Sequence, residues 1–182
     1  MFCGIFNDSQ FIISESYLTN IIQHKNGKSS EYQLFKGIAM YFKMKKNVKS
    51  RVLIYSKNIF NKVPKDFEKV EFEYEKFNKK YDVYVQKSKN SPEGQIEARY
   101  LFNTAFMDRF MQLQTSFKVK RIQCSIFGDS MLILLSTNKN LFELNNMFKS
   151  LDDTKQYSKL FDEFASVLSF LEILNLSSKT RL

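Results

Sequence analysis

The stretch that decides the fold is residues 70–114, VEFEYEKFNKKYDVYVQKSKNSPEGQIEARYLFNTAFMDRFMQLQ. Apolar Val70, Phe72 and Tyr74 alternate with glutamates, and this period of two is typical of a half-buried strand. Residues 77–80 predict a short turn, after which residues 81–85 repeat the alternation. We therefore expect two neighbouring strands here, with the glutamate row forming a solvated face.

The second part of this stretch predicts two consecutive helices. Ser91-Pro92-Glu93 combines a capping side chain, a proline suited to the first turn and a carboxylate that complements the helix dipole, so a helix should run to about Phe102. Asn103 and Thr104 can begin a second helix. Its apolar stripe at helical spacing is Phe106, Phe110 and Leu113.

The N-terminal part predicts hairpins. Asn7-Asp8-Ser9 separates two short apolar runs and supplies turn residues. Asn26-Gly27 predicts a type I′ turn between strands at 17–24 and 32–44, and a third strand is expected at 51–56. His24, the only histidine, lies beside this turn, and we expect an exposed residue at a strand end rather than a metal ligand or a catalytic base.

The C-terminal part predicts a further hairpin and a closing helix. Strands at 119–127 and 131–136 should be joined by a tight turn at 128–130, with Cys124 as a buried, inert thiol. A loop at 138–150 should carry a short helical turn around 141–144. The closing amphipathic helix follows Asp152 and Asp153, and its apolar residues are Leu160, Phe161, Phe164, Val167, Leu168, Leu171 and Leu174.

These elements predict one α+β domain over residues 1–182. We expect a mainly antiparallel β-sheet, with the mid-chain helical pair at 92–115 and the C-terminal amphipathic helix packed on one face. A chain that is 43% hydrophobic and 15% aromatic can bury one sizeable core.

The net charge of +9 indicates an anionic partner: nucleic acid, a lipid surface or an acidic protein. A lysine- and asparagine-rich solvated surface that reflects genome composition, with no partner, is the favoured interpretation of the charge alone. Cys3 and Cys124 lie far apart without metal-ligand spacing, which favours reduced thiols in the cytosol. No apolar run approaches the roughly 18 residues that cross a bilayer, so we expect a soluble, cytoplasmic chain.

The sequence contains no glycine-rich phosphate loop, nucleophile elbow or paired Cys and His ligands, and so predicts neither a metal nor a cofactor. The best scattered cluster is Glu97, Arg99, Tyr100, Asp108 and Arg109. An enzyme would need these side chains to converge in a pocket. We expect them instead to pair, with Glu97 or Arg99 bonded to a neighbouring strand or helix.

A run of basic residues without an acidic one begins at Lys36, and Tyr41 and Phe42 lie within it. Its further members are Lys43, Lys45, Lys46, Lys49 and Arg51. Strand periodicity places Lys43 and Lys45 on one face, and a turn should bring the others to the same end, giving a positive patch able to bind anions. An anionic membrane surface or an acidic protein ranks ahead of nucleic acid, because Tyr41 is the only ready stacking residue unless Phe42 faces outward.

The order of several motifs resembles a known family. The motifs are Leu34-Phe35-Lys36-Gly37-Ile38, Val70-Glu71, Phe77 ahead of Tyr81-Asp82-Val83-Tyr84, Ile96-Glu97-Ala98-Arg99-Tyr100-Leu101 and Thr104-Ala105-Phe106-Met107-Asp108-Arg109. Together they resemble the bacterial domain of unknown function 3137 family, some of whose members carry a galanin-like label. The resemblance covers roughly residues 2–176 and is most specific at residues 97–100. Asn103 and Ala105, on either side of Thr104, depart from the family pattern, since a proline is usual after the threonine.

The resemblance implies no established activity, catalytic residue or cofactor. Because family members often carry a membrane-spanning region ahead of this domain, it implies a soluble C-terminal domain that works near the inner membrane face. We therefore expect a non-catalytic binding or regulatory module in the cytosol. The alternatives are a nucleic-acid-binding protein that uses residues 36–51 and an enzyme with a site around Glu97, Arg99 and Asp108.

Overall fold

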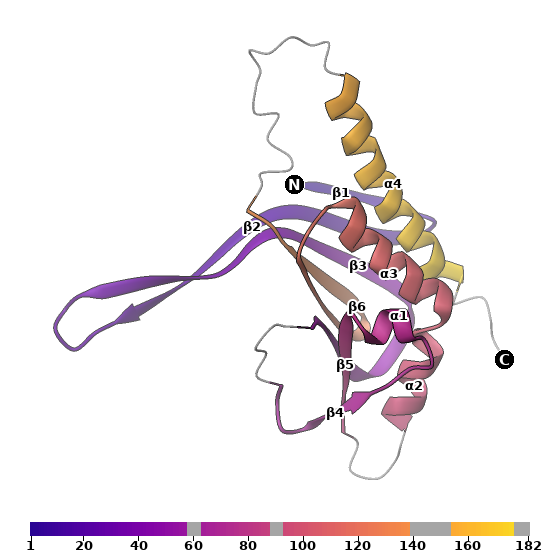
Figure 1. Ribbon diagram of the computed structural model, residues 1–182, viewed down its shortest axis with the longest axis horizontal. Coiled ribbons are helices and arrows are strands. Elements are labelled where there is room, and N and C mark those ends of the chain that lie inside the picture. The colour runs from indigo at the N-terminus through magenta and orange to yellow at the C-terminus, as the bar shows by residue number, and fades with distance from the viewer. Residues whose placement is uncertain (58–62, 88–92, 139–153, 177–182) are drawn as a thin grey trace.

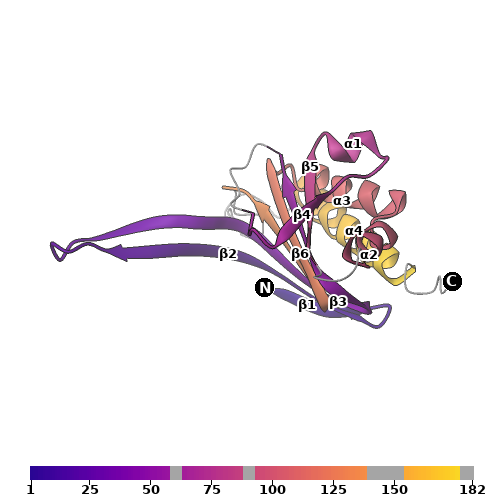
Figure 2. The ribbon, with the colours of Figure 1, turned by 90° about the horizontal axis from the view of Figure 1, so that it is seen from below.

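The computed structural model describes residues 1–57, 63–87, 93–138 and 154–176, and in the last helix it describes side chains at 158 and 161–172. It has the expected α+β architecture, in which the described helices gather on one face of a six-stranded antiparallel sheet (Figures 1 and 2). The strands are β1 (Phe2–Phe6), β2 (Ser9–Gln23), β3 (Ser29–Ser56), β4 (Phe67–Val70), β5 (Tyr81–Gln86) and β6 (Arg121–Ser136). The helices are α1 (Glu75–Asn78), α2 (Glu93–Leu101), α3 (Thr104–Ser116) and α4 (Thr154–Leu176).

β3 is the central strand. Ahead of a bulged segment its partners are β2 and β6, and after this segment its partners are β5 and β6. The sheet therefore has two halves that share β3 and β6, with β1 at the edge of one half and β4 at the edge of the other.

Two breaks predicted from the sequence are bends within continuous strands. The expected strands at 32–44 and 51–56 are both part of β3, whose pairing with β6 shifts register between Lys43 and Val48 and again between Val48 and Val52. The expected hairpin at 128–130 is also wrong, because both limbs of β6 pair with β3. Gly128, with φ of 61°, pairs with Val48 between the two limbs, where the β3–β6 register shifts. The same glycine that suits a turn allows a strand to bend while its ladder continues.

The two N-terminal hairpins are present, but the turn type of the second differs from expectation. Asn7 and Asp8 both have positive φ and link a β1–β2 pairing that closes at Phe6 and Ser9, as a type I′ turn requires. In the β2–β3 hairpin only Gly27 is left-handed, and the Gly27 amide donates to the carbonyl of His24 over 3.0 Å. The expected type I′ turn at Asn26-Gly27 is therefore wrong, because Asn26 lies outside the left-handed region.

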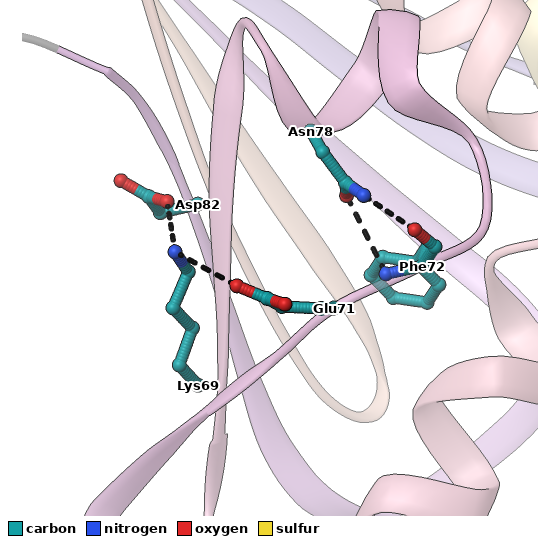
Figure 3. A network of polar contacts seen from close by, with 5 residues as sticks. All are labelled: Lys69, Glu71, Phe72, Asn78 and Asp82. Carbon is teal, nitrogen blue, oxygen red and sulfur yellow. Dashed lines mark hydrogen bonds and ion pairs between the residues drawn. The ribbon is translucent and has the colours of Figure 1, made fainter.

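The predicted strand at 70–75 ends at Val70, and the next residues turn into α1. Asn78 closes this turn, since its side chain accepts from the Phe72 amide and donates to the Phe72 carbonyl (Figure 3). The Phe72 ring packs against Phe77 and Phe102 with centroids 6.1 and 5.4 Å away. The alternation of apolar and acidic residues does not distinguish a strand from this turn, because the apolar side chains of a turn can also pack into the core.

A second polar contact joins β4 to β5 beside this turn. The Lys69 ammonium lies 3.0 Å from Asp82 and 3.5 Å from Glu71 (Figure 3). The hydrogen bond to Asp82 and the neighbouring carboxylate charges raise the pKa of Lys69. Glu71, Glu73 and Glu75 are all exposed, as expected of a solvated face.

The helices form largely as the sequence predicts. Asn103 caps α3 by accepting from the Phe106 amide over 2.8 Å, and Phe106, Phe110 and Leu113 are buried. The predicted cap at 91–92 and the helical turn at 141–144 lie outside the described residues. In α4, Val167 and Leu171 are buried, Phe164 and Leu168 are half-buried, and Phe161 is 73% exposed; the side chains of Leu160 and Leu174 lie outside the described set.

Phe170, which the sequence analysis did not select, fastens α4 to the rest of the core. It is fully buried, and its ring centroid lies 5.8 Å from Phe42, 5.4 Å from Phe106 and 6.3 Å from Phe110. One side chain thus joins the C-terminal helix to both β3 and α3.

Phe170→Ala should lower the free energy of unfolding by about 3–5 kcal/mol, because it leaves a cavity among these three rings. Urea denaturation would measure the loss. The matched control is Phe161→Ala in the same helix, which should change stability by less than about 0.5 kcal/mol. Equal losses in the two variants would show that α4 is not anchored through Phe170.

Candidate functional site

The cluster predicted on the two mid-chain helices does not converge on one pocket. Glu97 points to β3, while Asp108 accepts a hydrogen bond of 2.5 Å from the Tyr74 hydroxyl. Arg109 donates to Gln112 on its own helix over 2.8 Å. The remaining two, Arg99 and Tyr100, are exposed, Tyr100 to 72%.

Glu97 makes the expected bond to a neighbouring strand. Its two carboxylate oxygens accept from the backbone amides of Lys49 and Ser50 over 2.9 and 3.0 Å. These amides lie in the bulged segment of β3, between its pairing with β2 and its pairing with β5. The carboxylate thus accepts the hydrogen bonds that a neighbouring strand would otherwise accept from these amides. Two charge-assisted hydrogen bonds join α2 to the bulged segment of β3.

Gly94, one helical turn before Glu97, permits this close approach. A Cβ at Gly94 would lie 3.0 Å from the side chains of Ser50 and Val85. Ala98, next to Glu97, is fully buried. The small residues on this face of α2 let the helix backbone come near the sheet, and the carboxylate then reaches the β3 amides.

An open depression of 430 Å³ lies beside Arg99, but it does not gather the cluster. Its polar lining comes from Arg99, Glu71, Glu73, Tyr74, Asn103 and Thr104, and Glu97, Tyr100, Asp108 and Arg109 are not part of it. The convergence that the enzyme alternative requires is therefore not seen in these residues. Among the described residues, no group of three His, Cys, Asp or Glu side chains is placed to hold a metal ion.

The predicted basic run is partly neutralised. Lys43 lies 3.4 Å from Asp129, and Lys45 lies 3.0 Å from Asp8. A hydrogen bond from Ser130 and the charge of Lys43 lower the pKa of Asp129. The other members of the run are the half-buried Lys46, the exposed Lys49 and Arg51, whose guanidinium lies 5.1 Å from the centre of the Phe127 ring.

Two features were missed by sequence reasoning. The first is a projecting arm, residues 17–36, in which β2 and β3 leave the body as a two-stranded ribbon (Figures 1 and 2). Its large exposed apolar residues are Tyr17, Leu18, Ile21, Ile22, Tyr32 and Leu34. The second is a basic pocket at the root of the arm, which brings Lys36 close to the local run Lys118-Val119-Lys120-Arg121. That run was visible in the sequence, but its proximity to Lys36 was not.

His24 and Cys124 lie where the sequence placed them. His24 is exposed at the tip of the arm, and its Nε2 lies 2.8 Å from the Ser30 hydroxyl. Cys124 is buried, and this burial raises the pKa of its thiol, whereas Cys3 is exposed. In the described part of the chain, no helix has the length and apolar character that crossing a membrane requires.

The fold and these contacts define an α+β domain with a projecting β-arm and a basic pocket. A family model described as "Protein of unknown function (DUF3137)" matches residues 33–176, so the chain belongs to this family. No curated protein matches the chain significantly. A solved structure, described as the mycobacterial trehalose monomycolate transport factor A, TtfA, is similar with a TM-score of 0.44 and 9% identity, covering 86% of this chain and 70% of that one. Similarity at this level supports no transfer of function.

Glu97→Gln should destabilise the protein by about 1.5–3 kcal/mol. The glutamine side chain has one acceptor oxygen and no charge, whereas the two carboxylate oxygens of Glu97 each accept from a backbone N–H of β3. The urea midpoint would report the change. Glu73→Gln is the control, since it removes the same charge from an exposed side chain. A loss no larger than that of the control would mean that the carboxylate does not hold the bend.

Cys124 should resist a thiol reagent such as Ellman's reagent at pH 8, because a buried thiol with a raised pKa forms little thiolate. We expect one fast-reacting thiol, Cys3, in the native protein and a second one in denaturant. A Cys3→Ser variant leaves Cys124 alone and should show no fast phase. A fast phase in that variant would contradict the burial of Cys124.

Proposed function

We propose that this protein is a non-catalytic binding module that docks on an anionic membrane surface through its projecting arm, at the cytoplasmic face. The observation that carries the proposal is the set of large apolar side chains exposed along the arm. A two-stranded ribbon has no core of its own in which to bury such residues. A contiguous apolar surface rimmed by polar residues is typical of an interaction site.

The strand register places these apolar side chains on both faces of the arm. Leu18 and Ile22 share one face with Tyr32, because Asn20, which lies between them, pairs with Tyr32. Tyr17 and Ile21 stand on the opposite face. In the proposed binding mode the face of Leu18, Ile22 and Tyr32 lies in the headgroup region, where tyrosine is favoured.

Charge and backbone chemistry favour a lipid surface as the partner. Lys25 and Lys28 are exposed near the tip of the arm, and each lysine near an anionic leaflet contributes about 1 kcal/mol. The unpaired backbone N–H and C=O groups at the edges of the ribbon can stay hydrated in the headgroup layer. They would lose their water in the hydrocarbon core. The proposed binding mode is therefore shallow and salt-sensitive.

The contacts in the basic run do not favour the nucleic-acid alternative. The hydroxyl of half-buried Tyr41 lies 2.9 Å from that of Ser130, and Phe42 is fully buried. The two side chains that could have stacked on bases are thus held in the sheet and the core. The enzyme alternative lacks the convergence of Glu97, Arg99 and Asp108.

Co-sedimentation with vesicles tests the proposal. Wild-type protein should sediment with phosphatidylglycerol-containing vesicles and much less with neutral phosphatidylcholine vesicles, because the lysines need anionic lipid. Leu18→Ser combined with Ile22→Ser should weaken binding about tenfold or more, since two apolar contacts are lost.

The control variant is Ile5→Ser combined with Ile96→Ser, which removes exposed apolar side chains outside the arm. An equal loss in this control, or no wild-type binding to anionic vesicles, would contradict the proposal. A gel shift with single-stranded nucleic acid at matched salt tests the alternative. A stronger response there than with vesicles would reverse the ranking.

A further inference from the structure

A cavity of 520 Å³ opens where the arm meets the body. Three separate segments form its walls: the root of the arm at 33–36, residues 118–121 at the start of β6, and residues 136–138 at the end of β6. The cavity thus lies where the pairing of β6 with β3 ends and the arm continues. Leu34 of the arm also lines the pocket, but Leu18 and Ile22 are not among its lining residues, so the two sites adjoin and can be tested separately.

Backbone contacts hold two of these walls together. The Thr137 amide donates to the Lys36 carbonyl over 3.0 Å, which fixes the end of β6 beside the arm. Gly37 allows this approach, because a Cβ there would lie 2.0 Å from the Leu135 carbonyl oxygen. The position of Lys36 relative to 136–138 is therefore set by the strand pairing.

The third wall is fixed by the C-terminal end of α3. The amides of Lys118 and Val119 donate to the carbonyls of Thr115 and Gln114 over 3.1 and 3.2 Å. The Gln114 side chain in turn donates to the Lys120 carbonyl over 3.2 Å. Val119 is buried, so its neighbours Lys118 and Lys120 are directed to the surface on either side of an anchored residue.

The charged side chains that line the pocket are all positive. Lys36, Lys118, Lys120 and Arg121 line it, and none of its described lining residues is acidic. The ion pairs of the described structure occur elsewhere, on Lys43, Lys45, Lys69 and Lys79. A concave surface lined by cations concentrates positive potential, and an anion bound there would relieve the repulsion between them.

We propose that this basic pocket binds a phosphate ester. Arg121 offers the planar fork that suits phosphate oxygens, and the lysines supply mobile point charges. The cavity is within the size range of small-molecule sites and has room for the group that carries the phosphate. That group is either a free small molecule or the headgroup of a lipid, which present the same phosphate chemistry.

Titration with glycerol 3-phosphate, monitored by calorimetry at fixed ionic strength, tests the soluble form, and vesicles that contain phosphatidic acid test the lipid form. At least one of the two should bind saturably. Lys118→Gln combined with Lys120→Gln should weaken that binding about tenfold or more, because two charge-assisted contacts are lost. Comparable binding of both probes would identify the ligand as a free phosphate ester. Binding of the vesicles alone would identify it as a lipid headgroup.

The control is Lys76→Gln combined with Lys80→Gln, which removes the same charge from exposed positions outside the pocket. It should leave the titration unchanged, and circular dichroism should show that both double variants are folded. The absence of saturable binding of both probes, or an equal loss in the control, would overturn the inference. Leu18→Ser combined with Ile22→Ser should retain glycerol 3-phosphate binding, so this proposal and the membrane proposal can fail separately.

Discussion

The backbone ladder of β3 is the constraint on which the rest of this structure depends. β3 pairs with β2 before its bulged segment, with β5 after it, and with β6 in both parts. A strand that changes neighbours must leave some backbone amides without a ladder partner, and buried or half-buried amides need one. Glu97 meets this need for the half-buried Ser50 and also binds the amide of the neighbouring Lys49. Because Glu97 lies on α2, the same contact that satisfies the bend also fixes the helical layer on the sheet.

The extent of β6 along β3 also accounts for the two candidate interaction sites. The pairing of β6 with β3 ends at Ser136 and Gly37, yet β2 and β3 continue together to Gln23 and Ser29. Beyond Gly37 the sheet is therefore two strands wide in the described part of the chain, and apolar side chains that a wider, helix-covered sheet would bury are exposed. The same boundary places residues 136–138 beside Lys36, and the basic pocket forms there.

Charge in this protein is arranged by the fold rather than by the local sequence. The run between Lys43 and Arg51 is the denser cluster in the sequence, but carboxylates from distant positions, Asp8 and Asp129, pair with two of its members. Exposed pairs of this kind contribute little to stability, but they reduce the positive potential of the surface. The sparser set around Lys36 has no acidic residue in its described lining.

The sequence by itself determined the α+β class, the paired mid-chain helices with their Asn103 cap, and the buried stripe of α3, because helical period and capping are local properties. It also placed Cys124 in the interior and predicted that Glu97 or Arg99 would contact a neighbouring element, a contact that Glu97 makes. Only the tertiary structure decided that Gly128 bends a continuous strand, that residues 71–74 form a turn closed by Asn78, and that Lys36 lies near Lys118. Each of these depends on strand pairing or packing between residues far apart in the chain. A local pattern cannot report such contacts, since the same glycine or alternation is compatible with more than one neighbour.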